Sequence, residues 1–142
     1  MSTPAPPGHP GRPAPGAPCP CGWGEPFEDC CGRYLAGADA PTAEALMRSR
    51  YTAFALGDVA HLLRTWDPAT RPRELELDPQ VRWRRLVVVA TSGGGPFDDT
   101  GTVAFEAHHR REGRRGVQVE DSRFARSAGR WVYVGPDADR LA

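Results

Sequence analysis

Residues 41–68 read PTAEALMRSRYTAFALGDVAHLLRTWDP, and the spacing of their apolar side chains decides the fold class. The first part predicts a helix, because Asp39 or Thr42 can cap its start and Pro41 suits a first helical turn. One face of this helix carries Ala43, Leu46, Met47, Arg50, Tyr51 and Phe54. These positions lie close to the i, i+3, i+4, i+7 rule, which indicates an amphipathic helix with one buried side.

A second helix is predicted directly after the first. Gly57 is a typical helix stop, and Asp58 is a typical cap for the helix that follows it. The apolar face of this second helix carries Val59, Leu62, Leu63 and Trp66. Pro68 then ends the helical pattern. Residues 41–68 therefore predict two amphipathic helices joined by a tight turn.

The sequence from about residue 84 onward alternates as strands do. The run Leu86–Val89 predicts a buried strand, and a second strand has Val103, Phe105 and Ala107 on one face. Two further strands are expected at about 116–125 and 131–134, with turns between them. Strands joined only by turns are antiparallel neighbours, and two helices can cover one face of their sheet. The fold class is therefore α+β.

Length and charge limit what the protein can be. The chain has 142 residues, about one domain, and its 18 basic residues balance 18 acidic ones. Zero net charge argues against a nucleic-acid or anionic-membrane partner. Residues 1–18, rich in proline, glycine and alanine, predict a disordered leader without the features of a signal peptide, and 137–142 predict a short tail. We expect a soluble, cytoplasmic protein.

All four cysteines lie in a segment of thirteen residues, with the pattern C-x-C-x8-C-C: Cys19, Cys21, Cys30 and Cys31. Four thiols are the ligand set that structural zinc prefers. Metal binding on the order of 10 kcal/mol would fold this fragment, which has little apolar core of its own. The residue types therefore predict a structural Zn²⁺ site.

Other interpretations of the cysteines stay open from the sequence alone. Two disulfides are typical of secreted chains, and a redox pair would favour C-x-x-C spacing, which Cys21 and Cys30 lack. Cys30 and Cys31 are adjacent, so both can bind one ion only if the chain turns sharply between them. His9 or water is therefore an alternative fourth ligand to Cys31.

The segment CPCGWGEPFEDCCG, residues 19–32, resembles the SEC-C motif, a short zinc knuckle. That motif is best known at the C-terminus of the SecA translocation ATPase, where it contacts protein partners. Trp23 and Glu25 replace the usual serine and lysine, so the loop is less basic than in typical members. The resemblance implies a zinc knuckle over residues 19–36 that contacts a protein partner.

Further motifs in the same order resemble the YchJ family: APTAEALMRSRYTAFALGD, TWDP, EDSRF and GRWVYV. Members of this family join a SEC-C knuckle to a nuclear-transport-factor-two-like, or cystatin-like, domain, and the resemblance covers residues 19–135. It implies that residues 39–136 form a cone of helices on a curved antiparallel sheet. Longer members carry a second knuckle at the C-terminus, and this chain ends at Ala142 without one.

Arg50 lies on the apolar stripe of the first predicted helix, between Met47 and Phe54. A guanidinium facing a core needs a partner, and Glu120 in the third predicted strand could form a buried ion pair with it. Alternatively, Arg50 meets an anionic group of a ligand in a pocket. The residues expected to form that pocket are Arg50, Tyr51, Trp66 and Glu120, with Phe105, Phe124 and Trp131 as further lining.

The remaining polar clusters favour ordinary explanations. Arg110, Arg111, Arg114 and Arg115 surround a predicted hairpin turn and indicate a solvated tip.

Taken together, the motifs predict a zinc-binding module with a protein partner at the knuckle and a small ligand in the pocket. Two alternatives are an isomerase- or dehydratase-type enzyme, using Glu120 near Arg50, and a thiol redox protein. A dimer through the open sheet face is consistent with the fold analogy alone.

Overall fold

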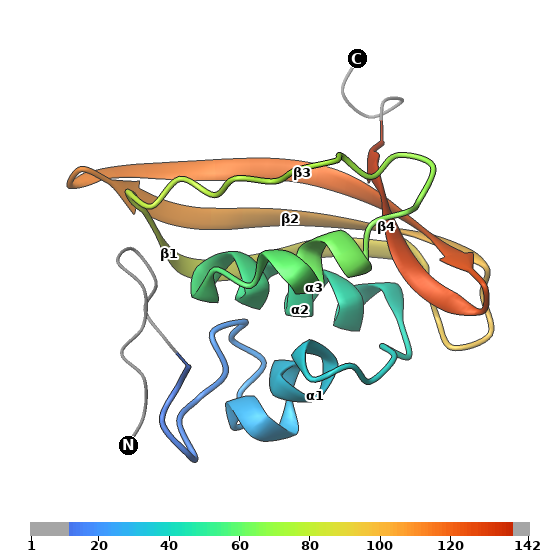
Figure 1. The fold of residues 1–142 in the computed structure, drawn as a ribbon, viewed down its shortest axis with the longest axis horizontal. Coiled ribbons are helices and arrows are strands. Elements are labelled where there is room, and N and C mark those ends of the chain that lie inside the picture. The colour runs from blue at the N-terminus through green and yellow to red at the C-terminus, as the bar shows by residue number, and fades with distance from the viewer. Residues whose placement is uncertain (1–11, 138–142) are drawn as a thin grey trace.

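One antiparallel sheet forms a layer of the computed structural model, which describes residues 12–137 (Figure 1). Its four strands follow chain order: β1 Val81–Gly93, β2 Thr100–Arg111, β3 Arg114–Ser127 and β4 Arg130–Pro136. All neighbouring strands are antiparallel. The predicted α+β class and four-stranded sheet are confirmed. Predictions about residues 1–11 and 138–142 lie outside the described residues.

The helices separate the sheet from the cysteine segment. They are the 3-10 helix η1 Phe27–Asp29, α1 Cys31–Leu35, α2 Ala43–Leu56 and α3 Val59–Arg64. The long helix α2 contacts β1, β2 and β4 on one side and α1 on its other side (Figure 1). The molecule therefore has three layers, in the order sheet, α2 with α3, and the cysteine segment with α1.

Capping residues set the limits of α2 and α3. The Thr42 hydroxyl accepts from the Ala45 N–H at 3.0 Å, so Thr42 caps α2, and Pro41 precedes the cap instead of lying in the first turn. Gly57 ends α2 in a left-handed conformation with φ 78°, which favours glycine. The prediction for the second helix was wrong at its end. Helix α3 stops at Arg64, because residues 65–67 pair with β4 instead.

The strands agree with the predicted faces in part. Val103, Phe105 and Ala107 are all buried beneath the helices, as predicted. Residues 86–89 lie in a strand, as predicted, but the prediction that the whole run is buried was wrong. Only Leu86 of the run is buried, and Val89 is 60 % exposed. Alternate side chains of β1 point to the outer face of the sheet, which no described element covers.

His61 joins α3 to α2 through a buried hydrogen-bonded chain. Its Nδ1 lies 2.8 Å from Nη2 of Arg64, and its Nε2 lies 2.9 Å from Oγ of Ser49. Arginine can only donate, so Nδ1 accepts and the proton resides on Nε2. The Ser49 hydroxyl in turn donates to the carbonyl of Leu46 at 2.7 Å. The chain requires a neutral imidazole.

We expect the protein to lose stability in mild acid because of His61. Burial, with the charge of Arg64 in addition, lowers the pKa of His61 from 6.5 to about 4. Between pH 6.5 and 4, His61 therefore binds a proton in the unfolded chain but stays neutral in the folded chain. The free energy of unfolding should fall by about 3 kcal/mol across this window.

The measurement is urea denaturation at pH 7, 6, 5 and 4 on the wild-type chain and on His61→Gln. The variant lacks the titrating group, so its free energy of unfolding should change less with pH. Equal pH dependence in the two proteins would assign the acid sensitivity to other groups.

Candidate functional site: the cysteine cluster and the cavity under the sheet

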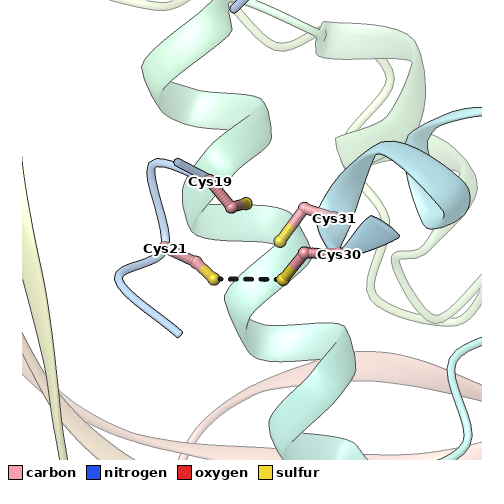
Figure 2. A group of neighbouring side chains, drawn as sticks. All are labelled: Cys19, Cys21, Cys30 and Cys31. Carbon is pink, nitrogen blue, oxygen red and sulfur yellow. Dashed lines mark hydrogen bonds between the residues drawn. The ribbon is translucent and has the colours of Figure 1, made fainter. Parts of the chain in front are cut away.

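The four cysteine side chains point toward one another from two short segments. Cys19 and Cys21 lie on the loop before η1, and Cys30 and Cys31 lie where α1 begins (Figure 2). All four side chains are buried, and their Sγ atoms lie within 4.8 Å of one another. The sulfurs of Cys21 and Cys30 are 3.6 Å apart, and none of the four forms a disulfide.

The turn required between the two adjacent cysteines is present. Cys30 has φ −124° and ψ −116°, outside the helical region, whereas Cys31 is the first residue of α1. This change of direction lets both side chains face the same point. Cys31 therefore belongs to the cluster. His9, the alternative ligand, lies outside the described residues.

Tight turns shape the loop that carries the first two cysteines. The Cys19 N–H donates to the Glu25 carbonyl at 2.9 Å, and the Gly22 N–H donates to the Cys19 carbonyl at 3.1 Å. Gly22 and Gly24 have φ of 80° and 103°, in the left-handed region that glycine adopts without a Cβ clash. The two glycines thus allow a loop closed enough to hold Cys19 and Cys21 on one side.

The cluster is fastened to helix α2. The sulfur of Cys19 lies 3.8 Å from the hydroxyl of the fully buried Thr52. Arg48 donates from Nη1 to the Cys21 carbonyl at 3.0 Å, and its guanidinium stacks over the Trp23 ring at 4.3 Å. The cysteine segment and the α+β domain therefore pack as one body along this helix.

Residues just before the cluster also pack on it. The Phe27 N–H donates to the Ala17 carbonyl at 2.9 Å, and the Gly16 N–H donates to Oε1 of Glu28 at 2.9 Å. Pro18 and Pro26 form a bridge. Gly16, Ala17 and Pro18, the last residues of the predicted leader, therefore contact the segment that carries the cysteines.

Burial and the mutual influence of the four thiols make it unfavourable for all four to be ionised at once. Hydrogen bonds from Cys21 and Cys31 lower the pKa of the Cys19 thiol, which can therefore ionise. Burial, with the charges of Cys21 and Cys19 in addition, raises the pKa of Cys30 to about 12. The pKa values of Cys21 and Cys31 are also raised, in each case chiefly by interaction with Cys19. A divalent cation at the centre would remove this opposition, as metal binding to thiols requires.

The geometry fits a tetrahedral metal site. Zinc–sulfur bonds of about 2.3 Å place the sulfurs of such a site about 3.8 Å apart. The 3.6 Å between the sulfurs of Cys21 and Cys30 is close to this spacing. The four sulfurs would supply all four positions of such a site and leave none for a further ligand.

A second candidate site is a cavity of about 190 Å³ between α2, the end of α3 and the sheet. Arg50, Trp66 and Glu120, three of the residues predicted for a pocket, line it together with Phe105 and Phe124. Tyr51 and Trp131, which the sequence also suggested for a pocket, do not line this cavity. Tyr51 follows Arg50 on α2, so its side chain points in a different direction from that of Arg50. Its ring packs against the ring of Trp83, with 6.1 Å between the ring centres.

Arg50 is buried, but its partner differs from the one expected. Its Nη1 donates to the Leu62 carbonyl and to Oγ1 of Thr65, both at 2.8 Å. The guanidinium carbon lies 4.5 Å from the centre of the Tyr133 ring and 5.0 Å from that of the Trp66 ring. Within residues 12–137, no ion pair joins Arg50 to a carboxylate. Burial lowers the pKa of Arg50 to about 10, and the charges of Tyr133 and Glu120 act in the opposite direction. The two aromatic rings and the Leu62 carbonyl also stabilise the guanidinium charge.

Glu120 belongs to a different hydrogen-bonded group on the opposite wall. Its Oε2 accepts from the hydroxyl of Tyr133 at 2.8 Å and from the hydroxyl of Ser122. Burial, followed by the charge of Glu120, raises the pKa of Tyr133, which stays a donor. We did not expect Ser122 and Tyr133 here. The period of two in β3 could have placed Ser122 beside Glu120, whereas Tyr133 comes from another strand.

The arginine-rich hairpin is solvated, as its sequence indicates. Arg111, Arg114 and Arg115 are exposed, and Arg111 forms an ion pair with Asp78 at 2.8 Å. His108 pairs with Glu106 on the outer face. None of the described helices is long and apolar enough to cross a membrane.

Fold and site together define a class of protein: an α+β domain of the nuclear-transport-factor-two-like kind that carries an N-terminal cluster of four cysteines. A family model described as "YchJ, middle NTF2-like domain" matches residues 42–136. The chain belongs to the YchJ family. The family resemblance of the sequence motifs is thereby confirmed.

Relatives extend across bacterial groups. The chain is 60 % identical over 116 residues to a UPF0225 protein of Corynebacterium efficiens, covering 81 % of this chain and 88 % of that one. It is 55 % identical over 121 residues to a UPF0225 protein of Streptomyces coelicolor, covering 84 % and 94 %.

Two solved structures are similar to the fold. One is the solution structure of a SEC-C motif containing protein from Rhodopseudomonas palustris, with a TM-score of 0.73 and 36 % identity. That match covers 86 % of this chain and 98 % of the other. A crystal structure of a SEC-C motif containing protein from Psychrobacter arcticus has a TM-score of 0.66 and 25 % identity, covering 85 % and 81 %.

Proposed function

We propose that the protein is a zinc-binding module in which one structural Zn²⁺ folds the cysteine segment and fixes it to α2. The observation that carries this proposal is the approach of four buried sulfurs to within 4.8 Å of one another. Zinc is the metal that four-cysteine tetrahedral sites most often hold in a structural role. Two solved structures similar to this chain are described as SEC-C motif proteins, which supports the same assignment.

Cys19, Cys21, Cys30 and Cys31 would hold the ion. The ion supplies charge neutralisation for four buried sulfurs and a cross-link between the loop and α1. Arg48 and Thr52 connect the ordered cysteine segment to α2, because Arg48 donates to the Cys21 carbonyl and Thr52 contacts the Cys19 sulfur. We place the protein in the cytoplasm, because a reducing compartment keeps these thiols available to the metal.

The folded knuckle would offer a surface to a protein partner. Trp23 is 51 % exposed although it stacks on Arg48, and it borders a groove of about 300 Å³. The groove lies between the cysteine segment and the start of α2, with Tyr34 and Pro41 in its wall. An exposed tryptophan beside an arginine has the composition of interface hot spots, which supports protein binding at this surface.

Native mass spectrometry of the full chain purified without chelator tests the metal proposal, together with a free-thiol count after denaturation. We expect one zinc per chain and four thiols. Thr52→Val, which removes a neighbour of the cluster but no ligand, should retain the metal. A chain with no metal and two fewer thiols would overturn the proposal in favour of disulfide chemistry between these cysteines.

A further inference from the structure

The cavity beneath the sheet has two charged groups of opposite sign in its lining, Arg50 and Glu120, and the charge of Glu120 acts against the lowering of the Arg50 pKa by burial without a direct ion pair between them within residues 12–137. Arg50 comes from α2 and Glu120 from β3, and both line the same space of about 190 Å³. Each is held by its own hydrogen bonds, and among residues 12–137 no ion pair joins them. None of the four cysteines lines this cavity.

Arg50 has hydrogen-bonding capacity left over. A guanidinium carries five N–H donors, and both of the bonds that Arg50 makes leave from Nη1. The rings of Trp66 and Tyr133 pack against its guanidinium and restrict its movement. Its remaining donors, on Nε and Nη2, are therefore held in one orientation at the wall of the cavity. They are suited to an acceptor oxygen.

Glu120 adds a hydrogen-bond acceptor to the donors that Arg50 presents. Both of its hydrogen bonds, from Tyr133 and Ser122, arrive at Oε2. A carboxylate offers sites on two oxygens, so Oε1 can accept from a further donor. Gln118, which is exposed, also lines the cavity and connects this wall with solvent.

The rest of the lining is apolar and the space is small. Met47, Phe54, Phe105 and Phe124 contribute side chains to it. The volume is below the roughly 300–1,000 Å³ of sites for drug-sized ligands. A fitting molecule therefore has an apolar body about the size of one six-membered ring.

We propose that this cavity binds a small neutral molecule with an apolar ring or chain and a head that carries an acceptor next to a donor, as a primary carboxamide does. The acceptor oxygen meets Arg50, and the N–H or O–H donor meets Glu120. Charge decides the selectivity. An anion would face Glu120 and a cation would face Arg50, and in each case the repulsion is stronger in a partly buried space than in bulk water.

Three probes of equal size and different charge test the proposal: benzamide, benzoate and benzamidine. Each is titrated into the full-length, zinc-loaded chain while ¹H–¹⁵N NMR resonances are followed. We expect benzamide to bind about tenfold more tightly than either charged probe, because each charged probe leaves one wall group unmatched. The shifted resonances should include the indole N–H of Trp66. A preference for benzoate or benzamidine, or no shift at cavity residues with any probe, would overturn the proposal.

The variant Glu120→Gln tests the contribution of the Glu120 charge separately from that of Arg50. This variant keeps the size of the side chain and removes its negative charge, so the preferred probe should change from benzamide to benzoate. Asp78→Asn makes the same change of charge on an exposed carboxylate outside the cavity, and it should keep the wild-type order of probes. If Glu120→Gln still prefers benzamide to the same degree, Glu120 does not select the ligand. If the variant does not fold, the ranking of probes on the wild-type chain decides alone.

Discussion

Replacing Cys31 with serine should unfold the cysteine segment and release the metal. Cys31 is 1 % exposed, begins α1 and supplies the fourth sulfur, so no neighbouring group can replace it. Structural zinc contributes on the order of 10 kcal/mol to small domains of this kind, more than the packing of the two buried apolar side chains Phe27 and Leu35 can replace. Hydrogen exchange measured by mass spectrometry should show protection lost across residues 19–36, with zinc absent from the protein.

The matched control is Trp23→Ala, which changes the same loop without removing a ligand. It should keep the metal and the protection of residues 19–36. Helix α2 should retain most of its protection in Cys31→Ser, because its other face still packs on Val103 and Phe105. A Cys31→Ser chain that keeps one zinc and the wild-type protection would contradict the assignment of Cys31.

Replacing Trp131 with alanine should have the second-largest effect, a loss of about 4 kcal/mol in the free energy of unfolding. Trp131 is 3 % exposed and joins β4 to the start of α2, where its Nε1 donates to the Pro41 carbonyl at 3.2 Å. The guanidinium of Arg126 covers the other side at 4.6 Å. Alanine would leave a large void there and an unpaired carbonyl. Urea denaturation at pH 7 measures the loss.

Trp131→Phe separates packing from hydrogen bonding at the same position. Phenylalanine fills most of the volume but cannot donate, so we expect a smaller loss of about 1–2 kcal/mol. If the alanine and phenylalanine variants lose equal stability, the hydrogen bond to Pro41 would dominate and the packing argument would fail.

Periodicity was sufficient to predict α2, the start of α3 and the buried face of the second strand. The positions of Leu46, Met47 and Arg50 on one face of α2 and of Val103 and Phe105 on one face of β2 follow from repeats of 3.6 and 2 residues. The four cysteines could be predicted as one cluster because they lie within thirteen residues of each other, so little chain has to fold to bring them together.

Features that depend on distant segments were not predictable in the same way. Trp66 continues the apolar stripe of α3 in sequence, yet it leaves the helix to pair with Tyr133. The register that places Tyr133 between Arg50 and Glu120 results from the pairing of β3 with β4 and from a bulge near Arg123. A sequence pattern identifies the buried charge of Arg50, but it does not show that aromatic rings and a carbonyl stabilise that charge.

The most direct test of the metal centre is zinc K-edge X-ray absorption on the purified, full-length chain. The arrangement of Cys19, Cys21, Cys30 and Cys31 predicts four sulfur ligands at about 2.3 Å and no nitrogen or oxygen ligand. A spectrum that requires a nitrogen or oxygen ligand in place of one sulfur would contradict a four-cysteine centre.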